Sequence, residues 1–272
     1  MALFSRAPVA CSVVNTTMAV TLSFENGVVL ITGGSRGIGA ACVRLFVEAG
    51  ARVAFSYRQA RSQAEALVRE CGPHHCFAIA SELDQSESAQ ALVAAAVEHY
   101  GRLDALVVNH GIAPDELPVD QITDARWRHT LAVNLDSAFS LVRSAVAQMK
   151  AQQGPGHIVL ISSASGQRGE ARICDYGASK GAIISLTKSL AAELASFGIY
   201  VNCVAPGWVN TDMAAPYLTG PALREGILQT IPLRRVGTPE ERAAPVLFLC
   251  TPHAGFMTGE IMNVNGGSAM VG

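Results

Sequence analysis

The stretch GVVLITGGSRGIG, residues 27–39, decides the fold because it joins an apolar run, a glycine-rich turn and the start of a helix. Its first part, GVVLITGG (27–34), is nearly continuous in apolar residues, as expected for a strand covered on both faces. Gly33, Gly37 and Gly39 allow a tight turn and let the backbone approach a phosphate at the helix N-terminus. This context favours a dinucleotide site over a plain turn.

The same alternation of apolar runs and amphipathic stretches continues along the chain. Six further runs are predicted to be strands: ARVAFSY (51–57), HCFAIASEL (75–83), LDALVVNHG (103–111), GHIVLISSAS (156–165), IYVNCVAPG (199–207) and EIMNVNGG (260–267). Helices are predicted to begin near Ala40, Arg61, Ser86, Asp124, Asp175 and Thr238. The pattern predicts an α/β fold, a single-domain Rossmann-type doubly wound parallel sheet of about seven strands with helices on both faces.

Composition favours a compact protein that acts on small molecules. Half of the 272 residues are apolar, so the chain can bury a large core. The 20 basic and 22 acidic residues give a formal charge of −2 without blocks of like charge, which argues against a nucleic-acid or membrane-surface binder. Seven scattered cysteines indicate neither a disulfide framework nor a metal site, and ECGPHHC (70–76) is interpreted as a turn after a helix. A cytoplasmic location fits this cysteine usage.

Two segments stand outside the regular pattern. Residues 1–22 are predicted to be a disordered N-terminal extension to a domain at 23–272, because they are too polar for a membrane span and make a poor signal peptide. The segment 212–235, rich in Pro, Gly and apolar residues, precedes the capping box 238–241 (TPEE). We expect this segment to be a small lid over the substrate.

The end of the second predicted strand bears on the choice of cofactor. An acid there would hydrogen-bond an adenosine ribose 2′-OH, but VAFSYRQARSQ (53–63) contains neither Asp nor Glu. Tyr57 and Arg58 follow the strand, and Arg36 lies within the glycine turn. Since an arginine can bind a 2′-phosphate through charge-assisted hydrogen bonds, NADP(H) is predicted. The alternative is that Arg58 belongs to a solvated helix start.

The stretch YGASK, residues 176–180, places a phenol and an ammonium on one face of a predicted helix. Tyr176 and Lys180 are four residues apart, so both side chains can point into one space. Reduction of a ketone leaves negative charge on oxygen, which requires a proton donor such as Tyr176. A free phenol has a pKa near ~10, and a neighbouring cation would favour its ionised form.

Six motifs together resemble the short-chain dehydrogenase/reductase family. They are TGGSRGIG (32–39), VNHG (108–111), VNL (133–135), ISS (161–163), YGASK (176–180) and PGWVNTDM (206–213), and the resemblance runs from about residue 25 to the C-terminus. In wording the chain is most similar to the 3-oxoacyl-[acyl-carrier-protein] reductase branch. The resemblance implies a Rossmann-type sheet, a catalytic Asn-Ser-Tyr-Lys set, and a homotetramer formed through the helices that carry Asn134 and Tyr176.

The resemblance also implies a role for each matching residue. Ser163 would hold the substrate oxygen, Tyr176 would be the acid/base and Lys180 would bind the nicotinamide ribose. Asn134 would hold a water for a proton relay, with a satisfied core amide as the alternative. The implied cofactor-binding residues are Gly33, Ser35, Arg36, Gly37, Ile38, Gly39, Tyr57, Arg58, Glu82, Leu83, Asn109, Gly111, Tyr176, Lys180, Pro206, Gly207, Val209 and Thr211.

Three departures from the family pattern concern the cofactor and the substrate. His110 stands where a small residue is usual, and Glu82-Leu83 replaces an Asp-Val pair. Carrier-protein reductases dock their partner through basic residues at positions where this chain has Gly154 and Phe197. Little preference for a carrier-protein substrate is therefore expected, unless Arg168 and Arg172 supply a substitute patch.

The sequence therefore predicts an NADP(H)-dependent oxidoreductase that interconverts a ketone and a secondary alcohol. Its motifs are most similar to those of 3-oxoacyl reductases. Its expected partner is a small-molecule carbonyl or alcohol substrate, and no metal, nucleic acid or membrane is expected. Two alternatives stay open. One is a dehydrogenase of a sugar, steroid or other small alcohol, and the other is a non-catalytic dinucleotide-binding relative.

Overall fold

Seven parallel strands form the central sheet of the protein, which is described by a computed structural model for residues 21–271. They are β1 (Val28–Ile31), β2 (Arg52–Tyr57), β3 (Cys76–Ala80), β4 (Ala105–Val108), β5 (Gly156–Ile161), β6 (Ile199–Pro206) and β7 (Ile261–Val264). Their order is β3-β2-β1-β4-β5-β6-β7, and every neighbouring pair is parallel. The predicted strands are confirmed, although each is shorter than predicted because the predicted ranges included adjoining loop residues.

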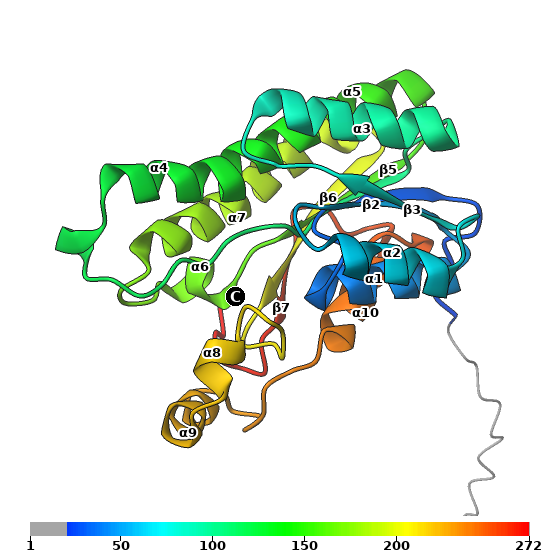
Figure 1. Ribbon diagram of the computed structural model, residues 1–272. Coiled ribbons are helices and arrows are strands. Elements are labelled where there is room, and N and C mark those ends of the chain that lie inside the picture. Colours follow the sequence, from blue (N-terminus) through cyan, green and yellow to red (C-terminus); the bar gives the residue numbers. More distant parts are fainter. Residues whose placement is uncertain (1–20, 272) are drawn as a thin grey trace, which may run out of the picture.

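Helices cover both faces of this sheet (Figure 1). One face carries α1 (Gly37–Glu48), α2 (Arg61–Cys71) and α10 (Glu240–Leu249). The other carries α3 (Ser86–Tyr100), α4 (Asp124–Leu131), α5 (Ser137–Gln152) and α7 (Cys174–Leu194). The doubly wound fold that the sequence predicts is therefore confirmed.

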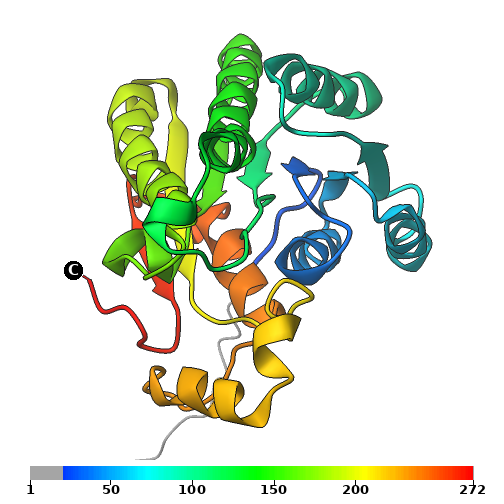
Figure 2. The ribbon, with the colours of Figure 1, turned by 60° about the vertical axis from the view of Figure 1, so that its left-hand side comes forward.

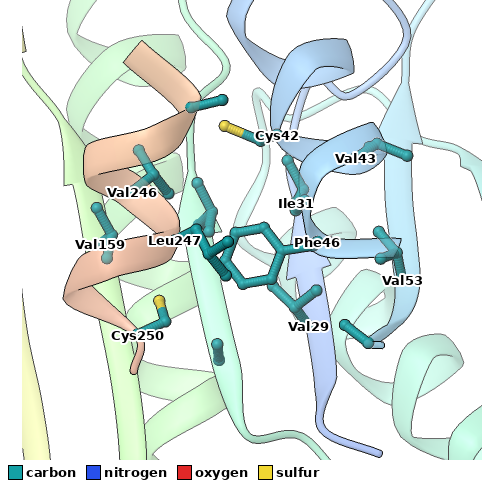
Figure 3. Packing of buried hydrophobic residues seen from close by; sticks show 14 of the residues in the cluster. Val29, Ile31, Cys42, Val43, Phe46, Val53, Val159, Val246, Leu247 and Cys250 are labelled. Atoms are coloured by element: carbon teal, nitrogen blue, oxygen red, sulfur yellow. The ribbon is translucent and has the colours of Figure 1, made fainter. Parts of the chain in front are cut away.

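Alternating side chains of β1 point into two buried layers, as the pleat of a strand requires. Val29 and Ile31 belong to the cluster under α1 and α10, whereas Leu30 belongs to the cluster under α3 and α5. In the first cluster, the fully buried ring of Phe46 packs between β1 and Leu247 of α10 (Figure 3). Burying a side chain of this size stabilises a fold by roughly 1.5–3 kcal/mol.

Short elements complete the connections between the strands and the long helices. They are the 3₁₀ turns η1 (Val119–Gln121), η3 (Ala195–Phe197) and η4 (Pro252–Ala254), the π-helical turn η2 (Ala132–Asp136), and the helices α6 (Ala164–Arg168), α8 (Ala215–Leu218) and α9 (Pro221–Gln229). Helices α8 and α9 lie within the predicted lid and project away from the sheet (Figures 1 and 2). The capping box before α10 is confirmed, because Thr238 Oγ1 accepts from the Glu241 amide at 3.3 Å and Glu241 Oε2 accepts from the Thr238 amide at 2.8 Å.

Most of the predicted N-terminal extension, residues 1–20, lies outside the described residues. Leu22, near its end, packs against the core cluster under α1. Within residues 21–271, no helix combines the length and apolar character needed to cross a membrane.

Candidate active site

A cleft of about 620 Å³ opens along the carboxyl ends of the strands, where the strand order reverses between β1 and β4. Open α/β sheets bind their ligands at this kind of reversal. Its lining contains all but two of the predicted site residues, from the glycine turn, the ends of β2 to β6 and the start of α7. The two exceptions, Gly39 and Asn134, are absent from the lining itself.

The glycine turn is shaped by close backbone contacts. A Cβ atom on Gly39 would overlap the carbonyl oxygen of Gly33, so another residue at position 39 would displace the start of α1. Asn109 Nδ2 donates to the carbonyl oxygens of Thr32 at 3.0 Å and Gly33 at 3.2 Å. The amide of Asn109 therefore fastens the end of β4 to the turn, in addition to its predicted place beside the adenosine.

The predicted adenosine end of the cleft carries charges of both signs. Arg58 Nη1 lies 3.8 Å from Glu82 Oε1, and Arg36 Nη1 lies 3.1 Å from Asp212 Oδ2. All four side chains are largely exposed. Glu82, which replaces the acid of the family's Asp-Val pair, thus places a carboxylate beside Arg58.

Asn134 lies in the π-helical turn η2, which joins α4 and α5 without a break. Its Oδ1 accepts from the Ile112 amide at 2.8 Å, and its Nδ2 donates to the Ile112 carbonyl at 2.9 Å and to Ser179 Oγ at 3.0 Å. These bonds satisfy the buried amide, as in the core-residue alternative. A Cβ on Gly111 would lie 3.1 Å from Asn134 Oδ1 and 3.3 Å from Lys180 Nζ, so these groups are close to one another.

Lys180 and Tyr176 share one face of α7, as predicted, with Lys180 Nζ 6.0 Å from the centre of the Tyr176 ring. The ammonium donates to the Ile161 carbonyl at 2.8 Å, and the residue is only 5% exposed. Burial lowers the pKa of Lys180 from 10.5 to about 8. An ammonium with this pKa can exchange its proton near neutral pH.

The sequence predicts that Lys180 lowers the pKa of the Tyr176 phenol, whereas in the structure this pKa is raised. Burial raises the pKa of Tyr176, its hydrogen bond with Ser163 opposes this shift, and the negative charge of Glu170 adds to it. Ser163 is thus the partner of the phenol in this structure. The neighbouring Ser162 also lines the cleft and donates to the Lys180 carbonyl at 2.7 Å.

His110 connects separate segments of the chain through side-chain hydrogen bonds that the sequence pattern does not predict. Thr32 Oγ1 lies 2.7 Å from Nδ1, while Nε2 lies 2.6 Å from Ser137 Oγ and 3.1 Å from the Val133 carbonyl. Because a carbonyl only accepts, Nε2 carries the hydrogen and Nδ1 accepts from Thr32. Burial lowers the pKa of His110 to about 3, so the ring is neutral and connects the glycine turn with η2.

Comparison with known proteins agrees with this geometry. Residues 33–269 match the family model described as enoyl-(acyl carrier protein) reductase. The chain is 38% identical over 257 residues to an uncharacterised oxidoreductase of Thermotoga maritima, covering 92% of this chain and 100% of that protein. It is 37% identical over 246 residues to a 3-oxoacyl-[acyl-carrier-protein] reductase of Synechocystis sp., covering 89% and 97%. The chain belongs to the short-chain dehydrogenase/reductase family. It is an oxidoreductase whose relatives include 3-oxoacyl-[acyl-carrier-protein] reductases.

A solved structure of the same family supports the arrangement of the elements. The 3-ketoacyl-(acyl-carrier-protein) reductase of Brucella melitensis, complexed with NADH, superposes with a TM-score of 0.85 at 28% identity and covers 91% of this chain and 100% of its own. Members of the short-chain dehydrogenase/reductase family bind a nicotinamide dinucleotide.

The sequence did not predict several residues that line the cleft, among them Ser165, Glu170, Trp208 and Tyr217. Ser165 lies on α6, Glu170 between α6 and α7, Trp208 after β6 and Tyr217 on α8. Residues at such positions do not lie at a fixed number of residues from a predicted strand or helix, so the sequence alone does not assign them to the cleft. The charge of Glu170, in the segment 164–173 before α7, is the feature of the sequence that could have indicated this residue. Of the charged residues in that segment, only Arg168 and Arg172 are considered in the sequence-based prediction.

Proposed function

We propose that this short-chain dehydrogenase/reductase uses NADP(H) to interconvert a ketone and a secondary alcohol, with Tyr176 as acid/base. The cleft carries the proposal, because it brings the glycine turn together with Ser163, Tyr176 and Lys180. An acetoacetyl-CoA reductase of Synechocystis sp., 37% identical over 248 residues, supports carbonyl reduction as the reaction type. NADPH oxidation with a panel of ketones, compared between the wild type and Tyr176→Phe, tests it.

The residues of the cleft fit a nicotinamide dinucleotide. The absence of side chains at Gly33 and Gly37 leaves the start of α1 accessible, and both glycines line the cleft. Pro206, Gly207, Val209 and Thr211 line it on the side of β6, where the nicotinamide would be held. A bridge from Val209 to Gly237 fixes this loop.

The protein residues have distinct tasks in the proposed reaction. When bound, the cofactor supplies or receives the hydride. Ser163 orients the carbonyl oxygen, and Tyr176 gives that oxygen a proton as the alcohol forms. Lys180, with a pKa of about 8, can return a proton toward the phenol. The complete set of polar residues favours an enzyme over the non-catalytic alternative.

Three further proposals concern the homotetramer that the family implies, the location of the protein and the lid. A homotetramer through α5 and α7 is supported by exposed apolar side chains on this side, among them Phe139 of α5 and Trp127 of α4. A cytoplasmic location follows from the cysteine usage and the small-molecule chemistry. The segment 212–235 remains our candidate for the lid, since Met213 and Tyr217 line the cleft.

Arg58→Ala is expected to weaken NADPH binding far more than NADH binding. A charge-assisted contact to the 2′-phosphate is worth about 1.5–3 kcal/mol, which corresponds to a loss of roughly 10- to 150-fold in Kd. Titration of both dinucleotides by fluorescence measures the two losses. Arg61→Ala is the matched control, because this arginine pairs with Glu65 one turn along α2.

Equal losses for NADPH and NADH in Arg58→Ala would contradict the proposed phosphate contact. Arg36 also lies in the cleft and can share the phosphate, so Arg36→Ala and the double variant complete the set. Glu82→Gln should strengthen NADPH binding, since it removes the carboxylate 3.8 Å from Arg58.

The chain is expected to show little preference for a carrier-protein substrate. Phe197 is 51% exposed where related reductases have a basic residue, and the candidate substitutes are paired, Arg168 with Glu170 and Arg172 with Glu116. Lys150 is a nearby cation, with Nζ 3.7 Å from the Phe197 ring centre. The measurement is kcat/KM for one 3-oxoacyl group on carrier protein and on a short thiol, at low and high salt.

A large, salt-sensitive advantage of the carrier-protein substrate would overturn this expectation. Lys150→Ala would then show whether that ammonium supplies the docking charge, because the variant would lose the advantage at low salt.

A further inference from the structure

Beyond Tyr176, the cleft continues between carboxylates and aromatic rings. Ser165 lines it from α6, Glu170 from the loop between α6 and α7, and Glu116 from the loop after β4. Trp208 and Tyr217 line it from the side of β6 and the lid segment. This part of the cleft, which we call the substrate end, indicates a class of substrate.

Glu170 is fixed so that its carboxylate faces the substrate end. Ser165 Oγ donates to Glu170 Oε2, and Arg168 Nη2 lies 3.6 Å from Oε1. Arg168 is itself held by the Ser268 carbonyl at 2.7 Å. The Glu170 side chain stays 32% exposed, and a carboxylate can accept about four hydrogen bonds. Lone pairs therefore remain for a ligand.

The Glu170 carboxylate and the Tyr176 phenol line the same cleft. Burial is the main cause that raises the pKa of Tyr176 and of Tyr217, and the charge of Glu170 contributes to both shifts. Glu170 thus lies within electrostatic reach of both phenols. A substituent next to a carbonyl bound by Tyr176 would come within reach of this carboxylate.

Aromatic rings and a second carboxylate complete the substrate end. The Trp208 and Tyr217 rings are 5.6 Å apart between centroids and inclined by 59°. Glu116 Oε2 lies 3.6 Å from Arg172 Nε. Aromatic faces pack against the C–H groups of a small ligand, and carboxylates accept from its hydroxyls.

This combination suits a neutral ligand with several hydroxyls better than an acyl thioester. An acyl chain has no donor, so it would bury a charged Glu170 without a new partner. A cationic ligand is less favoured, because Arg168 and Arg172 already neutralise Glu170 and Glu116.

We propose that Glu170 accepts a hydrogen bond from a hydroxyl on the carbon next to the reacting one, so that the substrates are small polyols and hydroxyketones. This inference rests on the proposed oxidoreductase function. In the oxidative direction, the carbinol C–H bond breaks with its electron pair moving as hydride to NADP⁺. The O–H proton passes to ionised Tyr176 and the C=O bond forms, while the neighbouring hydroxyl is unchanged.

The test uses two ketones that differ by one hydroxyl, 3-hydroxy-2-butanone and 2-butanone, each with NADPH. The wild type is expected to favour the hydroxyketone roughly tenfold or more in kcat/KM, because a site built to bind a hydroxyl discriminates against the analogue that lacks it. Glu170→Leu should abolish this preference by lowering kcat/KM for the hydroxyketone alone. Glu170→Gln keeps an acceptor oxygen and should retain part of the preference.

Glu193→Gln is the matched control, since Glu193 is exposed near the far end of α7 and should leave the ratio unchanged. Thermal unfolding followed by circular dichroism verifies the fold of each variant. If Glu170→Leu does not fold, the wild-type ratio and the Glu170→Gln ratio decide the question.

A wild-type ratio near one would overturn the inference, as would an equal loss for both ketones in Glu170→Leu or a higher kcat/KM for a 3-oxoacyl thioester than for the hydroxyketone. If both ketones are reduced without a preference for the hydroxyketone, the inference fails but the proposed oxidoreductase function stands. If neither the ketones nor the thioester is reduced, the proposed function itself fails and the inference fails with it.

Discussion

Tyr176→Phe is expected to lower kcat by roughly 10²- to 10⁴-fold, the usual contribution of a positioned proton donor. The phenol lies in the cleft and hydrogen bonds with Ser163, so the substitution removes the proton and little contact area. NADPH binding should change by less than about threefold. Steady-state kinetics on any ketone that the wild type reduces well, together with a binding titration of NADPH, measure both effects.

Tyr200→Phe is the matched control, because Tyr200 lies at the start of β6 and stacks on His157, 5.3 Å between ring centres. Its kcat should stay close to that of the wild type. A Tyr176→Phe variant that keeps near wild-type kcat would refute the role of the phenol.

Lys180→Met is expected to abolish most turnover and at the same time to stabilise the protein at pH 7. The pKa of Lys180 falls from 10.5 to about 8 on folding, so the buried ammonium costs roughly 3 kcal/mol at pH 7. Loss of its hydrogen bond to Ile161 offsets about 1 kcal/mol of the gain. A net gain of about 2 kcal/mol should raise Tm by roughly 4–8 °C.

The sign of the pH dependence provides a second check. Because the folded pKa is lowered, the unfolded chain binds more protons between pH 8 and 10.5, and wild-type stability from this group rises across that window. The advantage of Lys180→Met over the wild type should therefore shrink as the pH is raised from 7 to about 10. Lys188→Met, at an exposed position of the same helix, should show no such advantage. A Met variant no more stable than the wild type at pH 7 would contradict the cost of the buried charge.

The sheet could be predicted because each strand is an apolar run of its own, separated by a helical stretch. A parallel strand is buried on both faces, so Leu30 and Ile31 must both be apolar although they point into different layers. The strand ends were less predictable. In LDALVVNHG, for example, Asn109 and His110 follow β4 and make side-chain bonds to the β1 turn instead of continuing the ladder.

Cleft residues could be predicted where they belong to a motif with fixed spacing. Contacts between residues that are far apart in the sequence could be predicted less well. Tyr176 and Lys180 share a helix face by spacing alone. The pairing of Arg58 with Glu82 depends on the packing of two loops after neighbouring strands, and the π-helical form of η2 depends on bonds from Asn134 to Ile112. The shift of the Tyr176 pKa depends on burial and on Glu170, which no motif includes.

The central claim is that this protein moves a hydride between NADP(H) and a carbonyl carbon. Its most direct test is the fate of deuterium in NADPH labelled on one face of nicotinamide C4, incubated with the purified protein and a panel of ketones that includes 3-hydroxy-2-butanone and a 3-oxoacyl thioester. Mass spectrometry of the product alcohol should find one deuterium on the carbinol carbon, from one labelled face and not the other, and the labelled alcohol should form roughly 10²- to 10⁴-fold more slowly with Tyr176→Phe. Absence of label from the alcohol with either face, or equal transfer from both, would contradict the account.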